Sequence, residues 1–225
     1  METNGSKKNI AILAAGDFPT HPVPLRALRE ADFVVCCDSA YTRFSTFNSQ
    51  FSIPFIVIGD GDSLTEADKR ALGDRWIQVD EQDYNDLHKA MAWTMSEAGG
   101  RRAEVGKVTI LGATGRREDH TLGNISYLAT FAAEYPGIDI EMLTDHGRFC
   151  SFSGERTFEA FPHQQVSIFT LDAATAVSSE GLRWPLDRFR PAFWWQATLN
   201  DVLADRFTLD ADGPVIVFRT YDPKR

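Results

Sequence analysis

The chain has 225 residues, of which 43% are hydrophobic and 24% are charged, and its formal net charge is −9 at pH 7. This composition is that of a folded globular protein and excludes disordered and fibrous chains. The acidic balance argues against a nucleic-acid partner, because phosphate backbones are bound through clustered Lys and Arg.

Up to about residue 145, short apolar runs alternate with segments of helical period. This alternation predicts an α/β fold, a Rossmann-like and mostly parallel sheet with crossover helices. The predicted strands are Asn9–Ala14, Phe33–Cys37, Phe55–Ile58, Trp76–Val79, Val108–Leu111 and Asp139–Leu143. The predicted helices between them are Pro24–Ala31, Leu64–Leu72, Asp83–Glu97 and Glu118–Glu134.

After His146 the pattern changes to strands and turns, which predicts a small all-β domain, a β-sandwich. Its predicted strands are Arg148–Phe152, Arg156–Phe161, Val166–Leu171, Thr175–Ser179, Phe207–Ala211 and Val215–Thr220. The sequence therefore predicts two domains, residues 1–145 and residues 146–225. The aromatic stretch 181–200 fits neither pattern, and irregular segments of that length inside compact domains are often functional.

The chain shows no targeting or membrane signal. The start METNGSKKN lacks an apolar stretch long enough for a signal peptide, and no later run approaches a membrane span. The odd number of cysteines, with no zinc-ligand spacing, indicates reduced core residues. We therefore expect a cytoplasmic protein with no membrane partner.

Nearly every predicted strand of the first domain is followed by an Asp or a glycine-rich turn: Gly16-Asp17, Asp38, residues 59–63, Asp80 and residues 112–115. These ends meet at one edge of a parallel sheet, where ligands bind. Asp and Gly are common in turns, but carboxylates gathered at one edge repel each other unless a cation neutralises them. Magnesium, which joins carboxylates to substrate phosphates, is favoured over a merely solvated acidic rim, although composition does not exclude calcium or manganese.

The segment DYNDLHK, residues 83–89, opens a predicted helix with Asp83 as its expected N-cap. Asp86 and Lys89 share a face near the helix N-terminus, where a Lys opposes the helix dipole unless an anion faces it. A substrate phosphate is one candidate for that anion. The other is Asp86 itself, in an exposed salt bridge, and spacing alone does not choose between them.

The segment GATGRREDH, residues 112–120, follows a predicted strand and precedes a predicted helix. Its glycines would let the backbone approach phosphates while an Arg clamps them. The polar groups of Asp119, His120 and Asn124 have an alternative explanation in helix capping. The segment is neither a Walker loop nor a dinucleotide-binding fingerprint.

These three segments, in this order, resemble the thiamine pyrophosphokinase family. GDGDS at 59–63 is similar to the family's GDxDS, DEQDYNDLHKAM at 80–91 to its DQ-x-x-TD-x-x-K-A helix start, and GATGRREDHTLGNI at 112–125 to its GGRxDH-x-x-x-N motif. The turn Asp38-Ser39-Ala40 resembles the family's Asp-Gly-Gly, and the segment 181–186 resembles its Gly-Leu-x-Trp element.

The resemblance implies an enzyme that transfers diphosphate from ATP to the hydroxyl of thiamine, with Mg²⁺ as cofactor. It implies catalytic roles for Asp60, Asp62, Asp86, Lys89 and Asp119, whose four carboxylates hold the metal. It implies binding of ATP or thiamine by Asp38, Ser63, Gly112, Thr114, Gly115, Arg117, His120, Asn124, Trp184 and Asn200. It also implies a homodimer, in which the first domain of one subunit binds ATP and magnesium and the second domain of the other contributes to the thiamine site and the dimer interface.

Three departures from the family pattern keep other functions open. Arg116 stands where the family has its second Gly, Asn85 stands where it has Thr, and Ser39-Ala40 replaces a glycine pair. One alternative is a diphosphokinase for another hydroxymethyl heterocycle, such as a pterin. The other is a nucleotide- or thiamine-binding protein without turnover, which the intact set of Asp residues disfavours. For Trp184, a place in the hydrophobic core is the alternative to stacking on thiamine.

Overall fold

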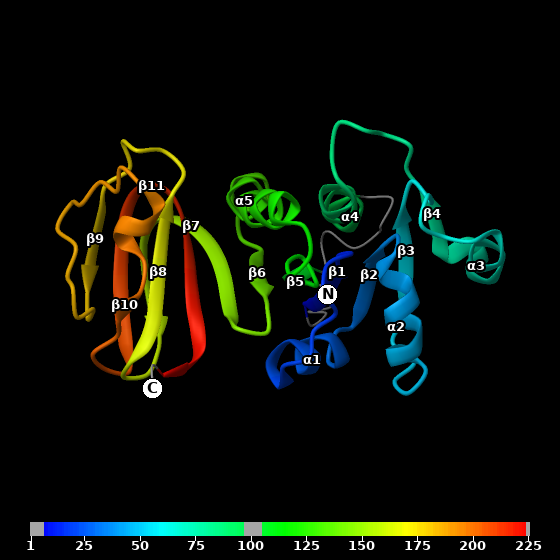
Figure 1. The fold of residues 1–225 in the computed structure, drawn as a ribbon, viewed down its shortest axis with the longest axis horizontal. Helices are drawn as coiled ribbons and strands as arrows, with labels where there is room; N and C mark the ends of the chain where they lie inside the picture. The colour runs from blue at the N-terminus through cyan, green and yellow to red at the C-terminus, as the bar shows by residue number, and fades with distance from the viewer. Residues whose placement is uncertain (1–6, 97–104, 224–225) are drawn as a thin grey trace, which may run out of the picture. The chain divides into compact units, whose positions relative to one another are not determined.

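The structure is a computed structural model that describes residues 7–96 and 105–223 (Figure 1). The chain divides into two compact units: Met1–Tyr127 with Gly137–Asp145, and Leu128–Pro136 with His146–Arg225. Each unit has a hydrophobic core of its own. Among the described residues, no helix combines the length and apolar character needed to cross a membrane.

The first unit contains a parallel sheet with the strand order β4-β3-β2-β1-β5-β6. The strands are β1 (Lys8–Leu13), β2 (Phe33–Cys37), β3 (Phe55–Gly59), β4 (Trp76–Gln78), β5 (Val105–Leu111) and β6 (Asp139–Leu143). Every residue of β2 is buried, as expected for a strand covered on both faces. The order runs outward from β1 in one direction to β4 and then restarts at β5 on its other side. This confirms the predicted α/β sheet and places its topological switch point beside β1.

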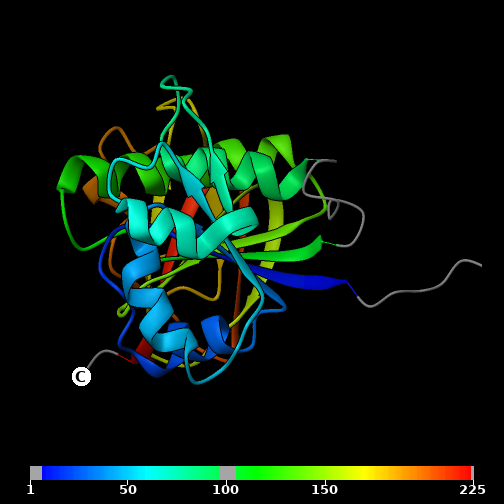
Figure 2. The same ribbon diagram turned by 90° about the vertical axis from the view of Figure 1, so that its right-hand side faces the viewer.

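Helices cover both faces of this sheet, with α4 on one face and α1 and α2 on the other (Figure 2). They are α1 (Pro22–Arg29), α2 (Ala40–Asn48), α3 (Glu66–Leu72), α4 (Asp86–Met95) and α5 (Glu118–Glu134). Helix α2 was not predicted, because only Ala40 and Phe44 of its nine residues are buried and no side chain caps its N-terminus. The predicted end of α4 at Glu97 lies outside the described residues.

From His146 onward the second unit is built from antiparallel strands, as predicted for its all-β class. They are β7 (Gly147–Glu159), β8 (Gln164–Thr170), β9 (Val177–Glu180), β10 (Asn200–Asp201) and β11 (Arg206–Pro223). Strand β11 pairs with β7 along most of its length, with β9 through its first part and with β8 through its second part. Strand β11 is continuous across a register shift between Ala211 and Val215, whereas the sequence pattern predicts two strands there, Phe207–Ala211 and Val215–Thr220.

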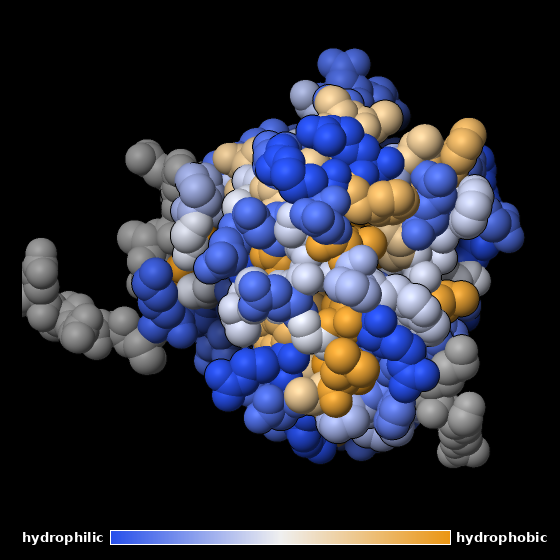
Figure 3. All heavy atoms as spheres, turned by 90° about the vertical axis from the view of Figure 1, so that its left-hand side faces the viewer, coloured by the Kyte–Doolittle hydropathy of each residue, from blue (hydrophilic) through white to orange (hydrophobic). Residues whose placement is uncertain are grey.

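The segment between β9 and β11 carries several exposed apolar side chains. They are Trp184, Phe193, Trp194, Trp195, Leu199 and Leu203. Figure 3 looks at the molecule from the side on which Figure 1 draws β9, and it shows apolar patches between hydrophilic side chains. The regular elements of this segment are the short 3-10 helix Trp194–Ala197 and strand β10.

Candidate functional site

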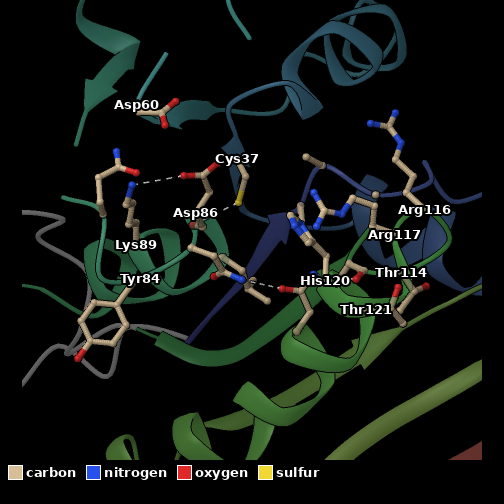
Figure 4. Close-up of a pocket in the computed structure, with 18 residues that line it drawn as sticks. Cys37, Asp60, Tyr84, Asp86, Lys89, Thr114, Arg116, Arg117, His120 and Thr121 are labelled. Carbon is tan, nitrogen blue, oxygen red and sulfur yellow. Dashed lines mark hydrogen bonds and ion pairs between the residues drawn. The ribbon is translucent and has the colours of Figure 1, made fainter. Parts of the chain in front are cut away.

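A pocket of about 420 Å³ lies at the carboxyl edge of the sheet in the first unit (Figure 4). Its walls come from the end of β2, from the segments that follow β1, β3, β4 and β5, and from the N-terminal parts of α4 and α5. The pocket therefore sits where the strand order reverses, which is the position at which open α/β sheets bind ligands.

The turns after β1 and β5 are joined backbone to backbone beside the pocket. The amide of Gly16 donates to the carbonyl of Gly112 at 2.6 Å, and the amide of Asp17 donates to the carbonyl of Thr114 at 2.8 Å. A Cβ atom on Gly16 would lie 2.4 Å from both carbonyl oxygens, so no larger residue fits there. Gly115 has φ +93°, in the region that favours glycine. The glycine-rich turn is thus held in one conformation.

Three carboxylates gather at the ends of β2, β3 and α4. Asp60 and Asp86 line the pocket, and Asp38 follows β2 with 4% of its surface exposed. Burial raises the pKa of Asp38, and the charges of Asp86 and Asp60 raise it further, against a hydrogen bond from the Ser63 amide. Burial also raises the pKa of Asp86, against the opposing effect of Lys89. Ionised together, these groups repel one another and would be stabilised by a cation.

Lys89 is buried against this acidic cluster. Its side chain leaves α4, and the residue is 7% exposed. The Lys89 Nζ lies 3.6 Å from the Asp86 Oδ1 and donates to the Val79 carbonyl at 3.3 Å. Lys89 therefore does have Asp86 as a partner, but the pair lies at the pocket wall with the Lys89 side chain buried and the Asp86 side chain partly exposed, and it is not a fully exposed salt bridge. An ammonium has three donors, so Lys89 can also face a ligand anion.

A chain of two amides ties three walls of the pocket together. Asn85 caps α4 by accepting from the His88 amide at 3.1 Å, and its Nδ2 donates to the Asn124 Oδ1 at 2.9 Å. Asn124 in turn donates to the Ala113 carbonyl at 2.8 Å. The prediction of Asp83 as the N-cap is therefore wrong: α4 begins three residues later, where Asn85 can both cap the helix and reach α5.

We expect Asn124→Ala to lower the free energy of unfolding by about 1–3 kcal/mol, because it leaves the Ala113 carbonyl and the Asn85 amide without their partner. Urea denaturation measures this change. Ser126→Ala on the same helix is the matched control, since Ser126 is exposed and its hydroxyl donates to the Gly123 carbonyl of the same helix. Equal stability of the two variants would show that the amide chain does not hold the walls together.

Basic side chains from the turn after β5 form the opposite wall. Arg116, Arg117 and His120 all line the pocket. Arg117 binds Asp119 through two hydrogen bonds, Nε to Oδ1 at 3.1 Å and Nη2 to Oδ2 at 2.5 Å. The hydrogen bond from Arg117 lowers the pKa of Asp119 to about 2. Arg116 lies 4.0 Å from Asp17. This wall offers guanidinium groups to a ligand anion.

The structure gathers most, though not all, of the predicted first-unit site residues around the pocket. The lining includes Asp60, Asp86, Lys89, Thr114, Arg117, His120 and Asn124. Asp38 and Ser63 are joined by a hydrogen bond behind it, and Gly112 and Gly115 shape the turn. Asp62 is exposed and its amide donates to Asp60, while Asp119 is turned to Arg117, so neither is among the lining residues.

Sequence reasoning missed several uncharged lining residues. They include Ala14, Cys37, Gln82, Tyr84 and Thr121. Ala14 and Cys37 stand at the ends of predicted strands, so their position was a usable signal. Tyr84 and Gln82 lie inside the DEQDYNDLHKAM motif, whose charged residues carry the predicted chemistry.

The carboxylates do not form a closed metal cage. Among the residues that the structure describes, no three His, Cys, Asp or Glu side chains are grouped to hold a metal ion. Asp60 and Asp86 nevertheless share a pocket wall, and the buried Asp38 Oδ1 has no hydrogen-bond partner within the described part of the chain. This arrangement fits magnesium, which keeps waters and uses one or two carboxylates together with substrate phosphates.

The two predicted site residues of the second unit also meet. The Trp184 amide donates to the Asn200 Oδ1 at 3.2 Å, and the Asn200 Nδ2 donates to the Trp184 carbonyl at 2.7 Å. Asn200 is buried, whereas Trp184 is 55% exposed, which rules out a place in the hydrophobic core. Asn200 thus fixes the backbone of Trp184 and leaves its indole accessible to a flat ligand.

Comparison with known proteins identifies relatives for both units. Residues 25–141 match the family described as thiamin pyrophosphokinase, catalytic domain, and residues 147–218 match thiamin pyrophosphokinase, substrate-binding domain. Thiamine pyrophosphokinase 1 of Oryza sativa subsp. japonica is 28% identical over 177 residues, covering 71% of this chain and 64% of that protein. Thiamin pyrophosphokinase 1 of Caenorhabditis elegans is 29% identical over 103 residues, covering 45% of this chain and 42% of that protein. The chain thus spans less than two thirds of either relative.

Solved structures show the same fold. Thiamin pyrophosphokinase from Candida albicans has a TM-score of 0.78 at 17% identity, covering 96% of this chain and 90% of that chain. Thiamine pyrophosphokinase from Bacillus subtilis has a TM-score of 0.73 at 22% identity, covering 96% of this chain and 100% of that chain. Since the catalytic-domain match alone covers more than half of the sequence, the chain belongs to the thiamin pyrophosphokinase family.

Proposed function

We propose that the chain transfers diphosphate from ATP to the hydroxyl of thiamine, giving thiamine diphosphate and AMP. The observation that carries this proposal is one pocket with an acidic wall, Asp60 and Asp86, and a basic wall, Arg116 and Arg117, at the switch point of the sheet. Such a pocket suits a polyphosphate that arrives with a divalent cation. Family membership supports the same chemistry.

The side chains have separate tasks in this proposal. Asp60 and Asp86, with Asp38 behind them, would hold magnesium, which neutralises phosphate charge when bound. Lys89, Arg117 and His120 bind phosphate oxygens, and the fixed turn at Thr114 offers backbone groups to them. Asp62 and Asp119 stay predicted metal ligands. Asp119 would first have to leave Arg117.

In this reaction the main contribution of the protein is to align the thiamine hydroxyl with the β-phosphorus of ATP. The thiamine hydroxyl oxygen forms a bond to the β-phosphorus of ATP, the bond from that phosphorus to the α–β bridging oxygen breaks, and AMP leaves with that oxygen. In a loose transition state little proton removal is needed early, so the hydroxyl proton can pass to water late in the reaction. In-line positioning and charge neutralisation supply the catalysis.

The assay is incubation with ATP, magnesium and thiamine, followed by quantification of AMP and thiamine diphosphate. We expect both products in equal amounts, and no diphosphorylated product when a hydroxymethylpterin replaces thiamine. ATP binding without any AMP would refute the enzymatic proposal in favour of a binding protein. Product from the pterin alone would assign a different acceptor.

Trp184 is the proposed stacking surface for thiamine. We expect Trp184→Ala to raise the KM for thiamine about tenfold while the KM for ATP stays unchanged, because an aromatic pair is lost. Trp195→Ala is the matched control, since Trp195 is an exposed tryptophan of the same segment. If both variants keep the wild-type KM for thiamine, Trp184 does not bind the acceptor.

Homodimeric assembly and a cytoplasmic location stay predictions.

A further inference from the structure

Tyr84 is an aromatic side chain at the rim of the pocket that the proposed chemistry leaves without a task. It belongs to the loop between β4 and α4 and is among the residues that line the pocket. Within the described part of the chain, it is the one aromatic ring of the lining apart from the imidazole of His120. The rest of the lining is charged, polar or aliphatic, so Tyr84 is the one large flat surface there.

The ring is held in place before any ligand binds. Its centroid lies 4.0 Å from that of His88, with 12° between the ring planes, and His88 lies 5.5 Å from the ring of Tyr127 on α5. The Tyr84 amide also donates to the carboxylate of Glu81 at 3.2 Å. Tyr84 nevertheless stays 50% exposed. It is therefore an immobilised ring with surface left to cover.

We infer that Tyr84 is the stacking platform for the purine base of the nucleotide that donates the diphosphate. This inference rests on the proposed function, which places a nucleoside triphosphate in this pocket. In that function the triphosphate binds Lys89 and Arg117 directly and Asp86 through a divalent cation, and the base must then lie against an uncharged surface. Figure 4 shows Tyr84 beside the Asp86–Lys89 pair and on the other side of the view from Arg116.

An aromatic ring that stacks on a base contacts the face of the base and not its hydrogen-bonding edge. Stacking therefore depends little on which base is bound. Tyr84 should therefore contribute equally to the binding of ATP and GTP. Its contribution should vanish for inorganic triphosphate, which has the charge but no ring. This difference separates a base platform from a general structural role.

The test measures dissociation constants of ATP, GTP and inorganic triphosphate, each with magnesium, by titration calorimetry on the intact protein. We expect Tyr84→Ala to weaken ATP and GTP about tenfold and to leave triphosphate unchanged. Tyr84→Phe keeps the ring and should bind all three like wild type. Phe51→Ala is the matched control, because Phe51 is an exposed aromatic residue of the same unit outside this pocket.

Two results would overturn the inference: an unchanged affinity of Tyr84→Ala for ATP, or an equal loss for ATP and triphosphate. A selective rise in the KM for thiamine would also overturn it, by assigning the ring to the acceptor. The proposed function is judged separately. If wild type binds ATP through Tyr84 but forms no thiamine diphosphate, the platform stands and the transfer reaction is wrong.

Discussion

Asp86→Asn is expected to lower the rate of diphosphate transfer by a factor of about 10²–10³ while the protein stays folded. The substitution keeps the shape of the side chain and removes one charge from the acidic wall of the pocket. The loss should appear in kcat at saturating ATP and magnesium, because in the proposed function the Asp86 carboxylate holds the cation that neutralises phosphate charge. Steady-state formation of AMP measures it. Asp74→Asn, an exposed aspartate outside the pocket, is the control and should keep wild-type turnover.

The same variant should not lose stability in the absence of metal. Burial raises the pKa of Asp86, so the fold disfavours its ionised form relative to the unfolded chain. A raised carboxyl pKa contributes stability that is present below the ordinary value of 3.8 and is lost as the pH rises through the raised value. Asp38 acts in the same direction. In EDTA, the melting temperature of Asp86→Asn at pH 7 should equal or exceed that of wild type.

These two expectations can fail independently. Turnover within threefold of wild type would remove Asp86 from the catalytic machinery. A marked loss of stability at pH 7 would instead mean that the pair with Lys89 outweighs burial and repulsion in the free protein. Lost activity together with retained stability is the result expected if the Asp86 carboxylate serves to bind a cation and does not stabilise the fold.

Lys89→Met is expected to lower the rate of diphosphate transfer about as much as Asp86→Asn does. Unlike Asp86→Asn, it is expected to lower the stability of the protein. In the proposed function Lys89 binds phosphate, so removing its buried ammonium should lower turnover about 10²–10³-fold. It also deprives Asp86 of its counter-charge and the Val79 carbonyl of a donor. Leaving buried polar groups without partners costs about 1–3 kcal/mol. Urea denaturation at pH 7 measures the loss.

Lys107→Met is the matched control. Lys107 on β5 makes ion pairs with Asp139 and Glu141 on β6, and it does not line the pocket. It should retain full activity. The contrast with Asp86→Asn is the sharper test, since the two substitutions remove the two halves of one ion pair. If both variants lost stability equally, the pair itself and not the crowded carboxylates would dominate the energetics of this wall.

Local patterns in the sequence were sufficient for the α/β sheet and for the position of its pocket at the carboxyl edge. Strand β2 was predicted to the residue because five consecutive apolar residues, buried on both faces, read as a parallel strand. Helix α2 was not predicted because only Ala40 and Phe44, one turn apart, are buried, so its sequence lacks a repeated apolar pattern. The long β11 was divided because the register shift near Ala211 looks like a turn in the sequence.

The sequence by itself determined which residue types gather at one sheet edge, since parallel strands deliver their carboxyl-terminal turns to the same side. Only the tertiary structure decided how they are partnered. It paired the buried Lys89 with a partly exposed Asp86, it paired Asp119 with Arg117, and it joined α4 to α5 through Asn85 and Asn124. The reason is physical: strand order and helix period fix where a side chain starts, whereas hydrogen bonds and burial between distant segments choose its direction.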